Sequence, residues 1–190
     1  MDVETKKKVL SKDINKEAYK KTFCELCHAI KTIEENKLFL SLNIGTSKLD
    51  RECVTEFGWC IFQKNGTLLK KKHAIVKENL KNNRYGETLP EDSVVQELIS
   101  IKEELQKDIE KINYIIGHEV NDTLDITAKL DIFNVSNSKF VFMKENKTPE
   151  YGIIDIQDLC SSRGLDKSLK KLVYPFNKTN NSGIIINYYF

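Results

Sequence analysis

Arginine is scarce in this sequence. Lys and Arg together number 30, but Arg occurs only at Arg51, Arg84 and Arg163. Specific reading of guanine favours the two-pronged hydrogen bonds of Arg, so the shortage argues weakly against sequence-specific recognition of bases. The 28 acidic residues leave a net charge of only +2, and this balance does not by itself indicate a nucleic-acid binder.

Long apolar runs are also missing. No run approaches the ~18–20 residues that a bilayer-spanning helix needs, and residues 1–21 lack the apolar centre of a signal peptide. We therefore expect no membrane association and a location in the cytoplasm or nucleus. The five cysteines are expected to be reduced thiols there.

Metal-ligand patterns are weak. The cluster Cys24-Glu25-Leu26-Cys27-His28 matches the c-type haem attachment pattern, but the apolar spacing around it favours the buried face of a helix. No second Cys or His pair has the spacing of a zinc site, and His73 is expected to be a solvated strand residue. The sequence therefore predicts no metal and no cofactor.

The chain has the size and composition of one globular domain. It has 190 residues, of which 40% are hydrophobic and 31% charged. We expect a Lys-rich tail and a helix in residues 1–36, followed by one domain in residues 37–190. The oligomeric state does not follow from the sequence.

Apolar periodicity predicts alternating strands and helices. Ser93 and Gln96 form a capping-box pattern that predicts a helix over 93–111, with Asp108 on its solvated side. Asn65-Gly66 predicts a hairpin turn with positive φ at both residues. The other predicted elements are helices at 16–35, 122–131 and 165–173, a helical turn at 157–163, and strands at 38–44, 53–63, 67–77, 112–116, 139–144 and 151–156. An antiparallel triplet followed by alternating α and β elements predicts an α/β fold with a mixed sheet flanked by helices.

Four segments, taken in order, resemble the DEDD-type 3′–5′ exonucleases. They are Leu40-Ser41-Leu42-Asn43-Ile44-Gly45 with Val54-Thr55-Glu56-Phe57-Gly58, then Ile115-Ile116-Gly117-His118 leading to Asp122, then Ile153-Ile154-Asp155, and finally Asn180-Asn181-Ser182-Gly183. The sequence is most similar to the fungal RNase H-like exonuclease-domain proteins, over about residues 37–190. The resemblance implies an RNase H-like fold and, in active members, two-metal cleavage of nucleic acids.

The residues that carry this chemistry are replaced. By the resemblance, the family's first Asp falls at Asn43, its Glu at Gly45 and its second Asp at Thr123. The general-base His falls near Asn180 and the closing Asp near Ile185. Mg²⁺ and Mn²⁺ require anionic oxygen ligands, which this set does not supply. Asp155, at the end of a predicted strand, is expected to cap a helix or to pin a loop.

The leading hypothesis is therefore a catalytically inactive domain that serves as a scaffold or binding module for a protein partner or RNA. The second hypothesis is a divergent metal-dependent exonuclease that uses Asp122, Asp125 and displaced acids. The third is a sequence-nonspecific nucleic-acid-binding subunit. Two lysine clusters fit either solvated faces or a patch that follows a phosphate backbone: Lys70, Lys71 and Lys72, and Lys167, Lys170 and Lys171.

Overall fold

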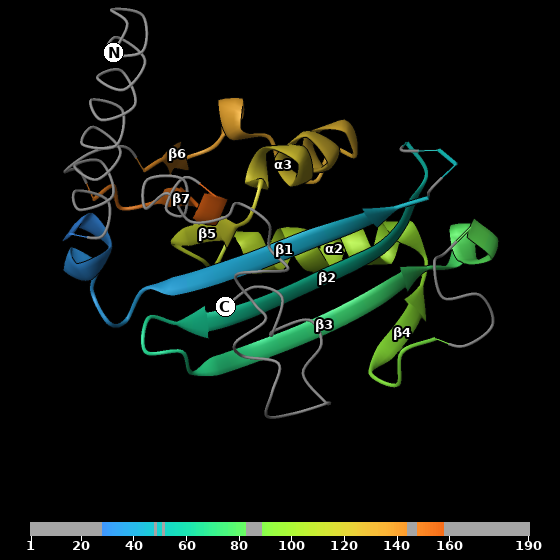
Figure 1. The fold of residues 1–190 in the computed structure, drawn as a ribbon, viewed down its shortest axis with the longest axis horizontal. Helices are drawn as coiled ribbons and strands as arrows, with labels where there is room; N and C mark the ends of the chain where they lie inside the picture. Colours follow the sequence, from blue (N-terminus) through green and yellow to red (C-terminus); the bar gives the residue numbers. More distant parts are fainter. Residues whose placement is uncertain (1–27, 48, 51, 83–88, 144–147, 158–190) are drawn as a thin grey trace, which may run out of the picture.

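The computed structural model describes residues 28–47, 49–50, 52–82, 89–143 and 148–157. Within these residues the chain forms one seven-stranded mixed sheet in the order β4-β3-β2-β1-β5-β7-β6 (Figure 1). The strands are β1 (Leu38–Thr46), β2 (Val54–Gln63), β3 (Leu68–Val76), β4 (Ser93–Gln96), β5 (Tyr114–Gly117), β6 (Val141–Phe142) and β7 (Gly152–Asp155). The helices are α2 (Leu98–Ile109) and α3 (Val120–Lys129), with short 3₁₀ segments η1 (Lys77–Asn82) and η2 (Val135–Asn137).

The sheet joins an antiparallel half to a parallel half at β1. β1, β2 and β3 form an antiparallel meander, and β1 then pairs in parallel with β5, which pairs in parallel with β7. The outer strands β4 and β6 pair in parallel with β3 and β7. The predicted α/β class with a mixed sheet flanked by helices is confirmed.

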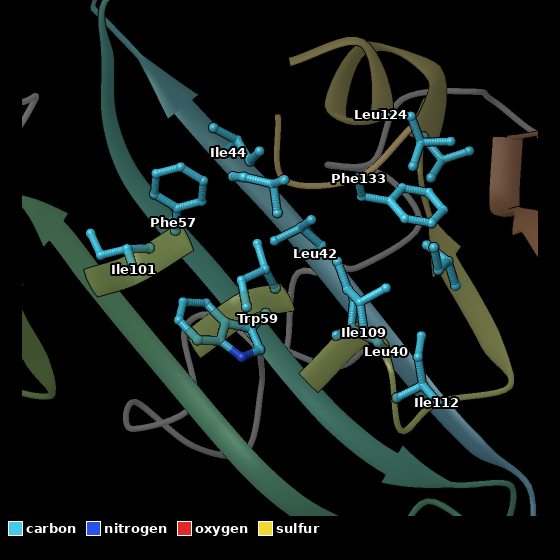
Figure 2. Packing of buried hydrophobic residues seen from close by; sticks show 14 of the residues in the cluster. Leu40, Leu42, Ile44, Phe57, Trp59, Ile101, Ile109, Ile112, Leu124 and Phe133 are labelled. Carbon is cyan, nitrogen blue, oxygen red and sulfur yellow. The ribbon is translucent and has the colours of Figure 1, made fainter. Parts of the chain in front are cut away.

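The larger hydrophobic cluster lies on one side of the sheet, under α2 and α3. Alternate residues of β1 and β2 point to this side, which we call the α2–α3 face. They pack with Ile101 and Ile109 of α2, Leu124 of α3, and Phe133 (Figure 2). The strand residues labelled in this view are Leu40, Leu42, Ile44, Phe57 and Trp59.

The opposite face of the sheet carries a second, smaller cluster. Phe39 stacks between Phe62 and Tyr114, with ring centroids 5.5 and 5.1 Å away. Ala29 and Ile33, at the end of the chain's first described helical residues (28–32), are buried in the same cluster. Because both faces of β2 are covered, its strand residues are buried almost throughout and show no polar alternation.

The turn between β2 and β3 also fixes the end of this first helix. Lys64 donates hydrogen bonds from Nζ to the carbonyls of Lys31 (2.9 Å) and Ile33 (2.6 Å). A positive side chain at carbonyls that have no helical partner is favourable at a helix end. The helix predicted to reach residue 35 therefore ends at residue 32. The domain boundary predicted between residues 36 and 37 stays a prediction.

The prediction of a helix beginning at Ser93 was wrong. Residues 93–96 form β4, which pairs with His73–Val76 of β3, and the Ser93 hydroxyl bonds His73 instead of capping a helix. The helix begins at Leu98, whose N–H donates to the Glu78 carboxylate at 3.1 Å. A residue of η1 thus supplies the acceptor that the local sequence was expected to provide.

The Asn65-Gly66 turn has a different geometry from the one predicted. Gly66 has φ +86°, but Asn65 does not have positive φ. The Gly66 N–H donates to the Gln63 carbonyl (2.9 Å) and the Gln63 N–H to the Thr67 carbonyl (3.0 Å). This is a three-residue hairpin loop in which glycine forms the bulge, so only one residue needs the left-handed conformation. The elements predicted at 157–163 and 165–173 lie outside the described residues, apart from Gln157.

Candidate functional site

The candidate site lies where the parallel strands β1, β5 and β7 end. Gly117 of β5 is level with Asp155 of β7, and β1 continues beyond the end of β5 through Asn43 and Gly45. The first turn of α3 begins next to the same edge. Carboxyl ends of parallel strands are the usual location of ligand sites in α/β sheets. The segments of the predicted site that are described thus belong to neighbouring strands and to the helix that follows β5.

Asp155 holds the start of α3 in place. Its carboxylate accepts the N–H groups of Glu119 and Val120, both at 3.1 Å, and of Gln157 at 2.8 Å. The helix has no side-chain cap of its own, and the preceding Glu119 has the left-handed conformation (φ 52°) that costs a non-glycine residue ~1 kcal/mol. Asp155 is buried and satisfies these donors from the adjacent strand. The prediction that it caps a helix is confirmed.

Gly45 has no room for a side chain. Gly45 lies opposite Glu56 in the β1–β2 register, and a Cβ added to it would come within 2.4 Å of both Cγ and Oε1 of Glu56. The Glu56 side chain therefore occupies the space in which an acidic side chain at position 45 would begin. Only glycine at position 45 lets the Glu56 side chain lie this close to the backbone of β1.

Glu56 is held there by a buried polar chain that crosses three strands. Its Oε2 lies 3.1 Å from Nε2 of His73 on β3, and Nδ1 of His73 lies 2.6 Å from the Ser93 hydroxyl on β4. Glu56 and His73 are 4% and 5% exposed. Buried polar groups persist when they are hydrogen-bonded, and removing one member costs the desolvation energy of the others. No pattern in the sequence predicts these hydrogen bonds, and the expectation that His73 is a solvated strand residue was wrong.

The other predicted positions are dispersed. Asn43 is exposed on β1 opposite Gly58, and Thr123 is partly exposed in the first turn of α3. Asp122 and Asp125 are both exposed on α3. Within the described residues, no three His, Cys, Asp or Glu side chains lie close enough together to hold a metal ion. Asn180 and Ile185 lie outside the described residues.

The three lysines of β3 do not share one surface. Successive residues of a strand point to opposite faces, so Lys71 lies on the other side of the sheet from Lys70 and Lys72. Lys70 and Lys72 contact Glu104 of α2, each at 2.9 Å, and Lys70 also bonds Asp108. Lys71 lies 3.1 Å from Asp92. Nucleic-acid binding by these lysines stays a prediction, as does binding by Lys167, Lys170 and Lys171, which lie outside the described residues.

Asp108 was expected on the solvated side of its helix, and this was wrong. It is 3% exposed and accepts the Trp59 Nε1–H at 2.9 Å, together with a bond from Lys70. Burial alone raises the pKa of the Asp108 carboxyl, but the hydrogen bonds from Lys70 and Trp59 outweigh it and hold the pKa below its usual range. The ionised Asp108 therefore ties α2 to the centre of the sheet.

Cys60 lies on the opposite face, in the second cluster. Burial is the main cause that raises the pKa of its thiol to about 11. A thiol with this pKa is protonated at neutral pH and is a poor nucleophile or metal ligand.

Within the described residues, no helix is both long and apolar enough to cross a membrane.

Comparison with known proteins adds no assignment: no protein-family model matches this sequence, and no curated protein matches it.

Proposed function

We propose that this chain is a catalytically inactive exonuclease-like domain that acts as a scaffold or binding module for a protein partner or RNA. The order of its strands supports the RNase H-like part of the proposal. In that fold an antiparallel meander is extended through its first strand by parallel strands that alternate with helices. The strands β3-β2-β1-β5-β7, with α2 and α3 between them in the chain, have this arrangement.

The observation that best supports the proposed inactivity is the position of the Glu56 side chain over Gly45. A two-metal site needs several carboxylates around one point. The β1 position at which the resemblance expects an acid has no side chain, and the space above it is filled by Glu56. That carboxylate is in turn bonded to His73. Its hydrogen bond and its burial both oppose its use as a metal ligand.

The charges support a protein partner over RNA. Lys70 and Lys72 make ion pairs with α2, and Lys71 pairs with Asp92 on the other face. A lysine that is already paired with a carboxylate neutralises a phosphate less well, so fewer counterions are released from the nucleic acid on binding. The near-neutral charge balance of the whole chain agrees with this.

Degradation of 3′-labelled single-stranded RNA and DNA by the full chain, with Mg²⁺ or Mn²⁺, tests the proposal. We expect no cleavage above that of a buffer control. Cleavage that is lost in the double variant Asp122→Asn/Asp125→Asn would overturn it in favour of a divergent exonuclease. A titration with single-stranded RNA at two salt concentrations distinguishes an RNA partner from a protein partner. Tight binding that falls steeply with salt would assign the module to RNA.

Restoring the acids provides a second test. The variant Asn43→Asp/Gly45→Glu/Thr123→Asp carries the family's acids at three positions, and Asn43→Asp/Thr123→Asp is its matched control without the clash at position 45. We expect both to remain inactive, and the triple variant to be the less stable of the two because Glu56 must move.

A further inference from the structure

The outer edge of β4 combines exposed apolar side chains with a backbone that no described strand pairs with. Val94 and Val95 are 46% and 39% exposed, and Ile99 at the start of α2 is 56% exposed. Neighbouring strand residues point to opposite faces, so the two valines present apolar surface on both sides of the edge. We call Val94, Val95 and Ile99 the β4 edge. An apolar edge of this kind is uncommon, since proteins usually protect sheet edges.

β4 is the last described strand on its side of the sheet. Within the described residues it pairs with β3 alone, and no strand lies on its outer side (Figure 1). In a parallel ladder alternate residues direct their N–H and C=O groups to the neighbour, and the remaining groups point outward. The sequence Ser93-Val94-Val95-Gln96 contains no Pro, Gly or Lys to prevent pairing.

The other edge of the sheet lacks this combination. β6 has only two residues, and although Val141 is 52% exposed, the strand is preceded by Lys139 and Phe140. The Lys139 ammonium lies 3.8 Å from the centre of the Tyr151 ring. A very short strand with a lysine beside it is a typical protected edge. β6 therefore serves as an internal control for β4.

Acidic residues lie at both ends of the β4 edge. Glu91 and Asp92 precede the strand, and Glu97 follows it. Glu78 lies at the same end as Glu97, where it accepts the Leu98 N–H. Lys71 and Lys77 pair with Asp92 and Glu97, so these four carboxylates outnumber the two ammonium groups that pair with them. This charge repels phosphate and attracts Lys or Arg.

We propose that the β4 edge binds an extended segment of a protein partner, with apolar residues at its centre and Lys or Arg at its ends, as an added strand. Backbone hydrogen bonds supply affinity, and the side chains beside Val94 and Val95 supply specificity. A second copy of this chain fits less well. Antiparallel pairing of two β4 strands places Asp92 of one copy near Glu97 of the other, and like charges that face each other are destabilising.

This inference rests on the proposed binding function and names the partner's chemistry. The probe is the capped peptide Lys-Thr-Val-Val-Thr-Lys, whose length matches residues 92–97 and places a Lys at each acidic end. Binding is measured by NMR titration of the ¹⁵N-labelled full chain. We expect shifts centred on the amides of residues 93–96, and affinity at least ~10-fold higher than for Glu-Thr-Val-Val-Thr-Glu at low salt.

Variants locate the binding site. Val95→Lys places a charge in the β4 edge and is expected to lower the affinity for the Lys-ended peptide at least ~10-fold. Val141→Lys on β6 should leave this affinity unchanged. Glu91→Lys, at an exposed position outside the strand, keeps the fold and should narrow the preference for the Lys-ended peptide. A peptide with alternate N-methylated amides should not bind, because it cannot form the backbone ladder.

Several results would overturn the inference. The first is an absence of chemical-shift changes at the amides of residues 93–96. The second is equal affinity for the Lys-ended and Glu-ended peptides, and the third is an equal loss of peptide affinity in Val95→Lys and Val141→Lys. A concentration-dependent dimer that Val95→Lys abolishes would assign the edge to a second copy and would also refute the inference. None of these outcomes touches the nuclease test, so a failed peptide titration with no cleavage rejects the β4 edge and leaves the inactive-domain proposal standing.

Discussion

The contact between Gly45 and Glu56 makes a quantitative prediction. Gly45→Ala places a Cβ 2.4 Å from Cγ and Oε1 of Glu56. The end of a glutamate side chain is normally flexible and moves cheaply, but here it is buried and bonded to His73. Moving it removes the buried hydrogen bond to His73 and overpacks the site, so we expect Gly45→Ala to lower the free energy of unfolding by about 2–4 kcal/mol.

A double-mutant cycle separates this cause from a general intolerance of side chains at position 45. Glu56→Ala alone also removes the bond to His73, and we expect a loss of about 2–4 kcal/mol. In the double variant Gly45→Ala/Glu56→Ala the added methyl group meets empty space. The double variant should therefore be about as stable as Glu56→Ala, with a coupling free energy of about 2 kcal/mol or more.

The assay is urea unfolding of the full chain, followed by Trp59 fluorescence and by circular dichroism. Gly66→Ala is the control for an added methyl group, since nothing lies within 4 Å of that position and only its φ of +86° opposes the change. We expect it to cost ~1 kcal/mol. If the losses of the two single variants sum to the loss of the double variant within ~0.5 kcal/mol, the proposed contact is refuted, because independent sites are additive to that precision.

Three further predictions follow from the buried polar groups. Asp155→Ala removes the acceptor of three N–H groups and should cost about 2–3 kcal/mol in urea unfolding, whereas exposed Asp122→Ala should change stability by no more than ~0.5 kcal/mol; equal effects would contradict the capping role. Asp108→Asn should destabilise the chain at pH 7. Because the folded-state pKa of Asp108 is depressed, this stabilisation is present above the unfolded pKa, and the difference from wild type should shrink as pH falls below ~4; a constant difference would count against it. Cys60 has a folded pKa of about 11 against an ordinary value of 9.0, so its contribution is complete below pH 9.0 and is lost as pH rises towards 11; Cys60→Ala should lose less stability over that interval in pH-dependent unfolding.

The sequence was informative where the signal was local. The meander of β1, β2 and β3 follows from apolar runs and from Asn65-Gly66, and the capping role of Asp155 follows from an acid at the end of a buried strand. Gly66 still adopts a bulged loop where a two-residue turn was expected, because turn type depends on the register that both strands adopt.

The failures have a common cause in contacts between distant residues. The pattern at Ser93 and Gln96 fits a capping box, but pairing with β3 and the bond to His73 place these residues in a strand. The position of Asp108 on its helix predicts exposure to solvent, but its hydrogen bonds with Trp59 and Lys70 place it against the sheet. The filling of the space over Gly45 by Glu56 depends on the β1–β2 register, which is tertiary information.

The central position of β1 has a consequence for the order in which the sheet forms and opens. Its pairing with β2 extends over the whole strand and joins residues close in sequence, whereas its pairing with β5 covers only Phe39–Ser41 against Tyr114–Ile116. Contacts between distant residues are the slower to form, because the intervening chain must first be closed into a loop. The meander is thus the natural early unit. The short junction between β1 and β5 is where amide hydrogens of the two halves should first exchange with solvent.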